Sequence, residues 1–241
     1  MDEIHYLLGN SCNLNCGFCF WNMRIKEESL EFKKKIVDYI VKSGIKQVTI
    51  SGGEPLCSNN FIEILRYMHD RNLRIILHTN GLGIDEKIAE KISKYVSRVS
   101  LALDGSNEEI NYNMRGNNAL FNQTLFLVDL FYKIGTPMNI KTLVPQINYN
   151  DVINIGNLVK DLPIEYWSIL EFNPINKGKT NKNRFFVEPE KFDNLINEIR
   201  VNFPNIKIKV RRFKSDQLKY CFIAQDGKVY TYNGKKDVLA G

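Results

Sequence analysis

Three cysteines within eight residues are the first feature of this sequence that could carry chemistry. Cys12, Cys16 and Cys19 form a C-x3-C-x2-C pattern directly after an apolar run near the N-terminus. Three thiolates on one short loop can bind three irons of a cubane 4Fe–4S cluster and leave the fourth iron without a protein ligand. An iron with an open position can bind a small molecule, so the pattern predicts a reactive cluster rather than a pure electron carrier.

Zinc is the competing interpretation of the three cysteines, but a structural zinc site usually has a fourth Cys or His ligand nearby. The nearest histidines in the sequence, His5 and His69, are not at ligand spacing. The other two cysteines, Cys57 and Cys221, stand alone, as buried thiols do. Two cysteines are too few to hold a second cluster without other ligands, so we expect one cluster.

A glycine pair with a carboxylate is the second motif, in Ser51-Gly52-Gly53-Glu54-Pro55. Two glycines let the backbone approach a ligand closely and offer N–H groups, and Glu54 adds a charged acceptor. Taken alone, the motif could be a turn that ends a strand. Its position one strand after the cysteines favours a ligand-binding function.

Apolar runs typical of strands alternate with segments of helical period, and this alternation must position both motifs. We expect strands at 4–9, 47–51, 73–79, 97–104, 138–144 and 166–172, and helices near 28–43, 60–71, 85–95, 118–134, 150–161 and 188–203. Six right-handed βαβ units predict an α/β fold with an all-parallel sheet, in the form of a partial (β/α)6 barrel. Active sites of such sheets lie at the C-terminal strand ends, where both motifs fall.

The chain after the last helix predicts a smaller β structure. Residues 1–204 are expected to form the partial barrel, and 205–241 a C-terminal extension with a short strand and a hairpin. Asp226-Gly227 is the expected hairpin turn.

Composition limits the class of protein. The 241 residues are 44% hydrophobic, and 33 Lys and Arg against 27 Asp and Glu give a net charge of +6. No apolar stretch reaches the roughly 18–20 residues that span a bilayer, and no secretory signal opens the chain. We therefore expect a cytoplasmic protein with no membrane partner. The charge excess is mild and gives no clear indication of nucleic-acid binding.

The two motifs in this order resemble the radical SAM superfamily, whose members carry such cysteines after strand one and a GGE motif after strand two. The resemblance implies a 4Fe–4S cluster and S-adenosyl-L-methionine (SAM) as cofactors. It also implies an electron donor such as flavodoxin or ferredoxin. The implied chemistry is reductive cleavage of SAM to methionine and a 5′-deoxyadenosyl radical, which abstracts hydrogen from a substrate.

The resemblance also implies residues that bind SAM. Gly52, Gly53 and Glu54 would contact the amino group of its methionine part, and Phe18 would pack near the adenine. Asn80 lies in an Asn-Gly turn after strand three, where the family often has a similar turn.

Two further residues follow strand four. Asp104 ends that strand, and Arg115 occupies a position where several members bind the SAM carboxylate. Ala102 departs from the family pattern, which often has Ser two residues before the aspartate. The carboxylate would then depend more on Arg115, unless Arg115 is simply a solvated arginine.

Within the superfamily the sequence most resembles the viperin-like nucleotide dehydratases, through CNLNCGFCF, SGGEP, DGSNEEINYNMRG, Trp167 and NRFFVEPEKF. That resemblance implies conversion of a nucleoside triphosphate to its 3′-deoxy-3′,4′-didehydro form. The later features recur in radical SAM enzymes that act on peptides, so modification of a ribosomally made peptide without auxiliary clusters is the alternative. A third interpretation, a cluster protein without catalysis, would leave the GGEP motif without a role.

A nucleoside triphosphate would need cations at the C-terminal mouth of the barrel. We expect these cations on strand five, on the loop after strand six and after the strand beyond the last helix. They are Lys141, Lys177, Lys179, Arg184, Arg211 and Arg212. The alternative for most of these residues is a solvated basic surface.

Overall fold

A computed structural model describes residues 2–20, 27–212, 221–231 and 236–237. Its described strands form one sheet in the order β10-β9-β8-β1-β2-β3-β4-β5-β6-β7. Strands β1 to β7 are parallel to their neighbours, β8 is parallel to β1, and β9 and β10 are antiparallel additions. Their bounds are β1 Glu3–Gly9, β2 Gln47–Gly52, β3 Arg74–Thr79, β4 Arg98–Ala102, β5 Met138–Val144, β6 Tyr166–Glu171, β7 Ile208–Arg211, β8 Cys221–Ile223, β9 Val229–Thr231 and β10 Lys236–Asp237.

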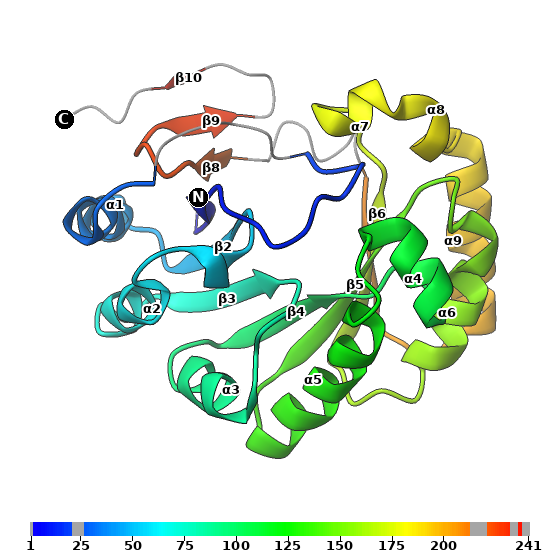
Figure 1. The fold of residues 1–241 in the computed structure, drawn as a ribbon, viewed down its shortest axis with the longest axis horizontal. Coiled ribbons are helices and arrows are strands. Elements are labelled where there is room, and N and C mark those ends of the chain that lie inside the picture. The colour runs from blue at the N-terminus through cyan, green and yellow to red at the C-terminus, as the bar shows by residue number, and fades with distance from the viewer. Residues whose placement is uncertain (1, 21–26, 213–220, 232–235, 238–241) are drawn as a thin grey trace.

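The described helices are α1 Leu30–Lys42, α2 Phe61–His69, α3 Glu86–Ser93, α4 Glu108–Arg115, α5 Leu120–Ile134, α6 Val152–Val159, α7 Lys177–Thr180, α8 Lys182–Phe185 and α9 Pro189–Asn202, with 3-10 turns η1 Pro55–Cys57 and η2 Tyr149–Asp151. Helices α1, α2, α3, α5, α6 and α9 cover the outer face of the curved sheet, whereas α4 follows the end of β4, and α7 and α8 follow the end of β6 (Figure 1). Side-chain caps begin several of them: Ser29, Asp85 and Asn107 accept hydrogen bonds from backbone N–H groups of the first turn.

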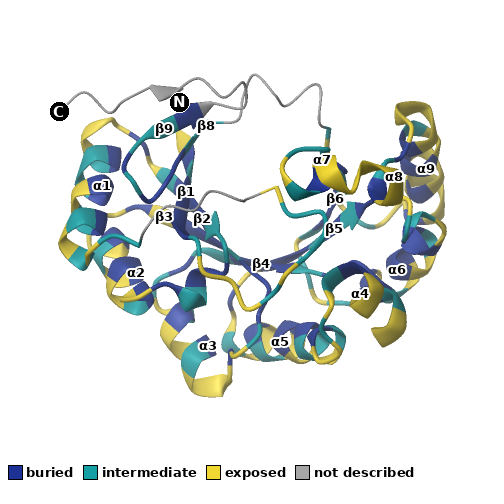
Figure 2. Ribbon diagram, turned by 45° about the horizontal axis from the view of Figure 1, so that its top comes forward, coloured by how far each residue is buried: buried dark blue, intermediate teal, exposed yellow. Residues whose placement is uncertain are grey.

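The two faces of the sheet differ in chemistry, because successive strand residues point to opposite sides. Every second strand residue belongs to the core beneath the helices, including Ile4, Tyr6, Val48, Ile50, Ile75, Leu77, Val99, Leu101, Ile140, Trp167 and Ile169. Figure 2 shows that the central strands are largely buried, whereas exposed residues gather on the helices and loops. The strand residues between the core residues line the inner face, which the helices leave uncovered. That face is largely polar, with His5, Thr49, His78, Ser100, Asn139, Lys141 and Ser168.

The predicted fold class is confirmed: six strand–helix repeats build a parallel sheet of partial-barrel form. The short helices α4, α7 and α8 were not predicted. Their apolar residues are too few to give a helical period; α4 buries only Asn111 and Met114. Strand β4 ends at Ala102 rather than at the predicted 104.

The C-terminal strands extend both edges of the same sheet. Strand β7 pairs with β6, and the β8–β9 hairpin pairs with β1. The predicted hairpin turn is confirmed, since Gly227 has a φ of +74° and its N–H donates to the Ala224 carbonyl at 3.0 Å. The division of the chain at residue 204 stays a proposal. Among the described residues, no helix is long and apolar enough to cross a membrane.

Candidate functional site

The cysteine loop begins where β1 ends, at the C-terminal edge of the sheet. Cys12 is exposed, and Cys16 and Cys19 are partly buried. The Cys19 N–H donates to the Cys16 carbonyl at 3.3 Å, and the Leu14 N–H donates to the Cys12 sulfur at 3.4 Å. The backbone therefore turns tightly around the three thiols.

Burial raises the pKa of Cys12 to about 11 and also raises the pKa of Cys16, although the nearby Arg115 charge opposes the shift at Cys16. A raised pKa favours the protonated thiol, and a protonated thiol must release its proton to bind a metal.

Three thiols on one loop can hold three irons of a cubane cluster, whereas a structural zinc usually takes a fourth Cys or His ligand. Among the residues that the structure describes, no group of three or more Cys, His, Asp or Glu side chains is placed to hold a single metal ion. The choice of a cluster over zinc stays a proposal.

The glycine pair allows the end of β2 to press against the cysteine loop. The Gly53 N–H donates to the Gly9 carbonyl at 2.8 Å, and the Glu54 N–H donates to the Ser11 carbonyl at 2.9 Å. A Cβ on Gly53 would lie 2.2 Å from the Ser11 oxygen, and Gly52 has a φ of +126°. Side chains at these positions would push the cysteine loop away, so the pair sets the distance between the two motifs.

Glu54 is buried and makes its hydrogen bonds inside the protein. Its carboxylate accepts from the Thr79 hydroxyl at 2.5 Å, from the Asn80 N–H at 2.8 Å and from the Leu56 N–H at 3.3 Å. Burial raises the pKa of Glu54 in spite of these bonds. The side chain thus ties the GGEP turn to the end of β3. Its predicted contact with the SAM amino group stays a proposal.

Asn80 links β3 to the cysteine loop. Its side-chain amide donates to the Asn13 side-chain oxygen at 2.7 Å, and its own side-chain oxygen accepts from the Leu82 N–H at 2.8 Å. Asn80 therefore connects the two segments, and its predicted contact with SAM stays a proposal.

Asp104 and Arg115 form a buried pair beside the cysteines. One Asp104 oxygen accepts from Arg115 Nε at 2.5 Å, and the other accepts from the Leu143 N–H at 2.8 Å. Although burial opposes its charge, the neighbouring Asp104 and Cys16 raise the pKa of Arg115 above its ordinary value. The guanidinium lies 5.0 Å from the centre of the Phe18 ring. A fixed cation and an aromatic ring thus meet at the loop.

The segment of α7 and α8, for which the sequence predicted only substrate cations, packs on the cysteine loop. Asn181 donates to the Gly17 carbonyl at 2.9 Å, and Asn176 donates to the Phe20 carbonyl. Phe185 of α8 meets Phe18 edge to face, with ring centres 5.8 Å apart. Short helices α7 and α8 therefore hold the loop from the side opposite β2.

The structure does not bring the six predicted substrate cations together in one site. Lys177 donates to the Asn15 side chain, Arg184 donates to the Asn113 carbonyl at 3.2 Å, and Arg212 pairs with Asp193. Lys179 is exposed on α7.

Lys141 and Arg211 instead lie on β5 and β7 with inner-face registers. Lys141 Nζ is 3.1 Å from His78 Nδ1, and the His78 ring contacts His5 with centres 5.9 Å apart. Neither histidine was predicted as a site residue. Their polar character at inward positions of β1 and β3 is the signal that could have found them.

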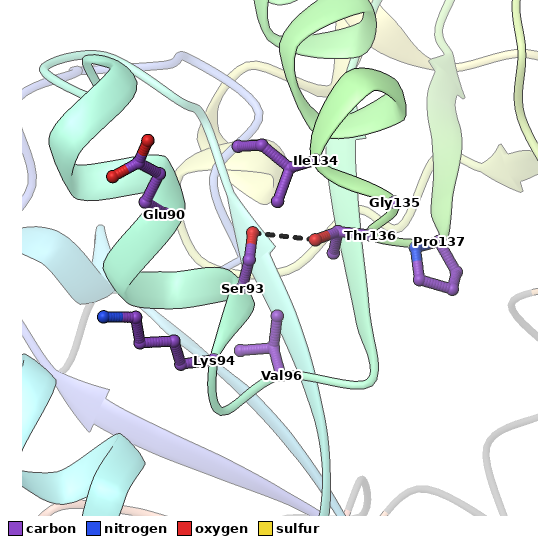
Figure 3. Close-up of a pocket in the computed structure, with 8 residues that line it drawn as sticks. All are labelled: Glu90, Ser93, Lys94, Val96, Ile134, Gly135, Thr136 and Pro137. Carbon is purple, nitrogen blue, oxygen red and sulfur yellow. Dashed lines mark hydrogen bonds between the residues drawn. The ribbon is translucent and has the colours of Figure 1, made fainter.

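Figure 3 shows a surface hollow that none of the predicted site residues lines. It is lined by the end of α3 and by the residues before β4 and β5, namely Glu90, Ser93, Lys94, Val96, Ile134, Gly135, Thr136 and Pro137. These residues precede the strands, so the hollow is at the opposite end of the sheet from the cysteines.

Comparison with known proteins places these features in a family context. Residues 6–159 match the sequence model of the Radical SAM superfamily. The chain is 31% identical over 180 residues to an AdoMet-dependent heme synthase of Methanosarcina barkeri, covering 73% of this chain and 52% of that protein. It is 23% identical over 208 residues to an S-adenosylmethionine-dependent nucleotide dehydratase of Lacinutrix mariniflava, covering 80% of this chain and 43% of that protein.

The fold is also similar to that of SuiB from Streptococcus suis, solved with S-adenosylmethionine and with the precursor peptide SuiA. The TM-score is 0.80 at 16% identity, covering 98% of this chain and 63% of SuiB in the S-adenosylmethionine complex. The chain spans about half the length of the two curated relatives.

Proposed function

The chain belongs to the radical SAM superfamily, and from that premise we propose that it cleaves S-adenosylmethionine reductively at a single 4Fe–4S cluster held by Cys12, Cys16 and Cys19. The observation that carries the proposal is the contact of the cysteine loop with the glycine pair at one strand edge, through the Gly53 and Glu54 N–H groups. The family implies SAM and an iron–sulfur cluster; the ligand set and cluster type are our proposal.

When bound, the cluster and SAM supply a one-electron cleavage that yields a hydrogen-abstracting radical. The chain's own residues orient the reactants. Gly52 and Gly53 leave room for the methionine part, and Arg115, fixed by Asp104, offers N–H donors to its carboxylate. The Phe18 ring offers an apolar face to the adenine. An electron donor such as flavodoxin or ferredoxin completes the proposal.

As substrate we propose a nucleoside triphosphate, which loses water from its ribose to give the 3′-deoxy-3′,4′-didehydro form. Two features support this choice. One relative is named a nucleotide dehydratase. The inner face of the barrel also carries Lys141 and Arg211, which no acidic residue pairs in the described parts of the chain.

The test of the ligand set is anaerobic reconstitution with iron and sulfide. We expect the wild type to bind a cluster and to form 5′-deoxyadenosine from SAM with dithionite. Cys12→Ala, Cys16→Ala and Cys19→Ala should lose both, because each removes one iron ligand. Cys57→Ala and Cys221→Ala are the matched controls and should keep both. Loss of iron in either control would show that the ligand set is wrong.

The test of the substrate is incubation with SAM, reductant and each of CTP, UTP, GTP and ATP. Mass spectrometry should show one nucleotide converted to a product lighter by one water. No conversion of any of the four would overturn the nucleotide proposal and favour the peptide alternative, while 5′-deoxyadenosine formation would still support the SAM cleavage.

A further inference from the structure

Side chains from alternate strands meet on the inner face of the sheet. His5 belongs to β1, His78 to β3, Lys141 to β5 and Arg211 to β7. In closed (β/α)8 barrels, side chains of alternate strands likewise form layers, but those layers are filled mainly by bulky apolar residues. We call His5, His78, Lys141 and Arg211 the basic layer. Its basic side chains differ from the apolar layers of closed barrels, and packing alone does not explain them.

Three members of the basic layer are in contact, and the exposed Arg211 influences all three through its charge. The two histidine rings contact each other edge to face at 5.9 Å, and Lys141 Nζ lies 3.1 Å from His78 Nδ1. Strands two apart in a sheet are separated by about 9–10 Å. These contacts are possible because β4, between β3 and β5, carries the short inward side chains Ser100 and Ala102.

Two members of the layer, Lys141 and Arg211, carry positive charge that no carboxylate pairs in the described residues. The acid whose charge favours the protonated form of Lys141 is Asp104, and its two oxygens accept hydrogen bonds from Arg115 and from the Leu143 N–H. Desolvation and the charges of Arg211 and Arg115 lower the pKa of Lys141 to about 7. Cations placed close together repel one another, and a bound anion offsets this repulsion.

We propose that His5, His78, Lys141 and Arg211 bind the phosphates of the substrate on the inner face of the barrel. This inference rests on the proposed function and deepens it, because it gives the substrate an orientation. Lys141 and Arg211 supply charge, and the imidazoles of His5 and His78 supply further polar contacts.

A phosphate fits the layer better than a peptide backbone. A neutral peptide would cover Lys141 and Arg211 without pairing their charges, at the cost of desolvating them. A triphosphate carries several negative oxygens and can contact both cations at once. A single carboxylate could pair with one of them, so the experiment below separates these anions by their charge.

The layer also sets a direction for the substrate. His5 is four residues before Gly9, where the cysteine loop begins, which is about 13 Å along the strand. Phosphates held at the layer would leave the sugar toward the C-terminal edge, where the cysteines and the Gly52-Gly53 pair lie. Lys177, Lys179 and Arg184, which the sequence also predicted as phosphate contacts, belong to helices α7 and α8, which pack on the cysteine loop. Phosphates bound there would lie beside the cysteines and not on the inner face.

The test is calorimetric titration of CTP, UTP, GTP, ATP and inorganic triphosphate into the SAM-loaded, cluster-containing protein. We expect Lys141→Met and Arg211→Met each to weaken binding of the preferred nucleotide by about tenfold or more, and to weaken inorganic triphosphate similarly. Lys87→Met, on the exposed outer surface of α3, is the matched control and should bind as the wild type does. Acetate, as a single carboxylate, should not compete.

Folding and SAM cleavage are measured on the same variants. Lys141→Met should keep its cluster and melt no lower than the wild type, because the variant removes a buried cation that no carboxylate pairs in the described residues. If the wild type binds a nucleotide and Lys141→Met and Arg211→Met bind it equally well, the basic layer is refuted while the proposed function stands. If Lys179→Met weakens nucleotide binding more than Lys141→Met and Arg211→Met do, the phosphates bind at α7 and the basic layer is likewise refuted. If the wild type cleaves SAM but binds neither nucleotide nor triphosphate, the layer and the nucleotide substrate both fail.

Discussion

Replacing Glu54 separates its structural role from a role in SAM binding. In Glu54→Gln the side-chain oxygen can still accept from the Asn80 N–H, and the new amide can donate to the Thr79 hydroxyl. The long 3.3 Å hydrogen bond from the Leu56 N–H is the one that is lost, because the amide nitrogen takes the place of its acceptor. A charge-assisted bond becomes a neutral one, which costs roughly 1 kcal/mol. Since burial already raises the pKa of Glu54, the neutral side chain also avoids a desolvation penalty. We therefore expect a loss of at most about 1 kcal/mol in the free energy of unfolding.

Glu54→Ala is the contrasting variant. It leaves the Thr79 hydroxyl and the Asn80 N–H buried without their acceptor. Each unsatisfied buried group costs about 1–3 kcal/mol, so the variant should lose about 4 kcal/mol. For a chain of this length, 1 kcal/mol corresponds to a shift of about 2–4 °C in Tm. The expected fall in Tm is thus about 2–4 °C or less for Gln and about 8–16 °C for Ala.

Thermal melting gives the stability of the two variants, and calorimetry with SAM gives their affinities. If Glu54 binds the SAM ammonium group, Glu54→Gln should weaken SAM about tenfold or more while the cluster still assembles. An unchanged SAM affinity would remove the ammonium contact and leave Glu54 as a positioning residue. Equal destabilisation by Gln and Ala would refute the hydrogen-bond argument itself.

Three further predictions follow from the same geometry. Gly53→Ala should lose most of its iron after reconstitution, because the new Cβ would lie 2.2 Å from the Ser11 carbonyl oxygen; Gly44→Ala, with no atom within 4 Å of the new Cβ, should cost about 1 kcal/mol of stability and keep its iron. Asp104→Asn should lose about 3 kcal/mol in urea unfolding, because it removes the buried partner of Arg115; full stability in this variant would contradict the pairing. In the folded protein the pKa of Lys141 is lowered to about 7, against about 10.4 in the unfolded chain. Protonated Lys141 therefore destabilises the folded state. This destabilisation is absent above about pH 10.4, grows as the pH falls to about 7 and is constant below that. The stability of the wild type relative to Lys141→Met should therefore rise between pH 7 and pH 10, and a flat difference would contradict the depressed pKa.

Local patterns in the sequence determine much of this protein. The cysteine spacing and the glycine pair each lie within a few residues, so their chemistry can be recognised without a structure. Strand and helix periods, with the right-handed βαβ rule, determine the parallel sheet and the edge at which both motifs lie. The hairpin turn at Asp226-Gly227 is equally local. These features depend on short-range geometry.

Only the tertiary structure brings together residues that are distant in the sequence. Lys141 and His78 are separated by 63 positions, and Lys177 and Asn15 by 162. Whether such side chains meet depends on strand order, on the curvature of the sheet and on the small residues of the strands between them. Sequence reasoning therefore named Lys141 and Lys177 for one site, whereas the folded chain places one on the inner face and the other on the cysteine loop. A period of two residues assigns a side chain to a face of a strand, but only the closed arrangement of strands decides which neighbours it has there.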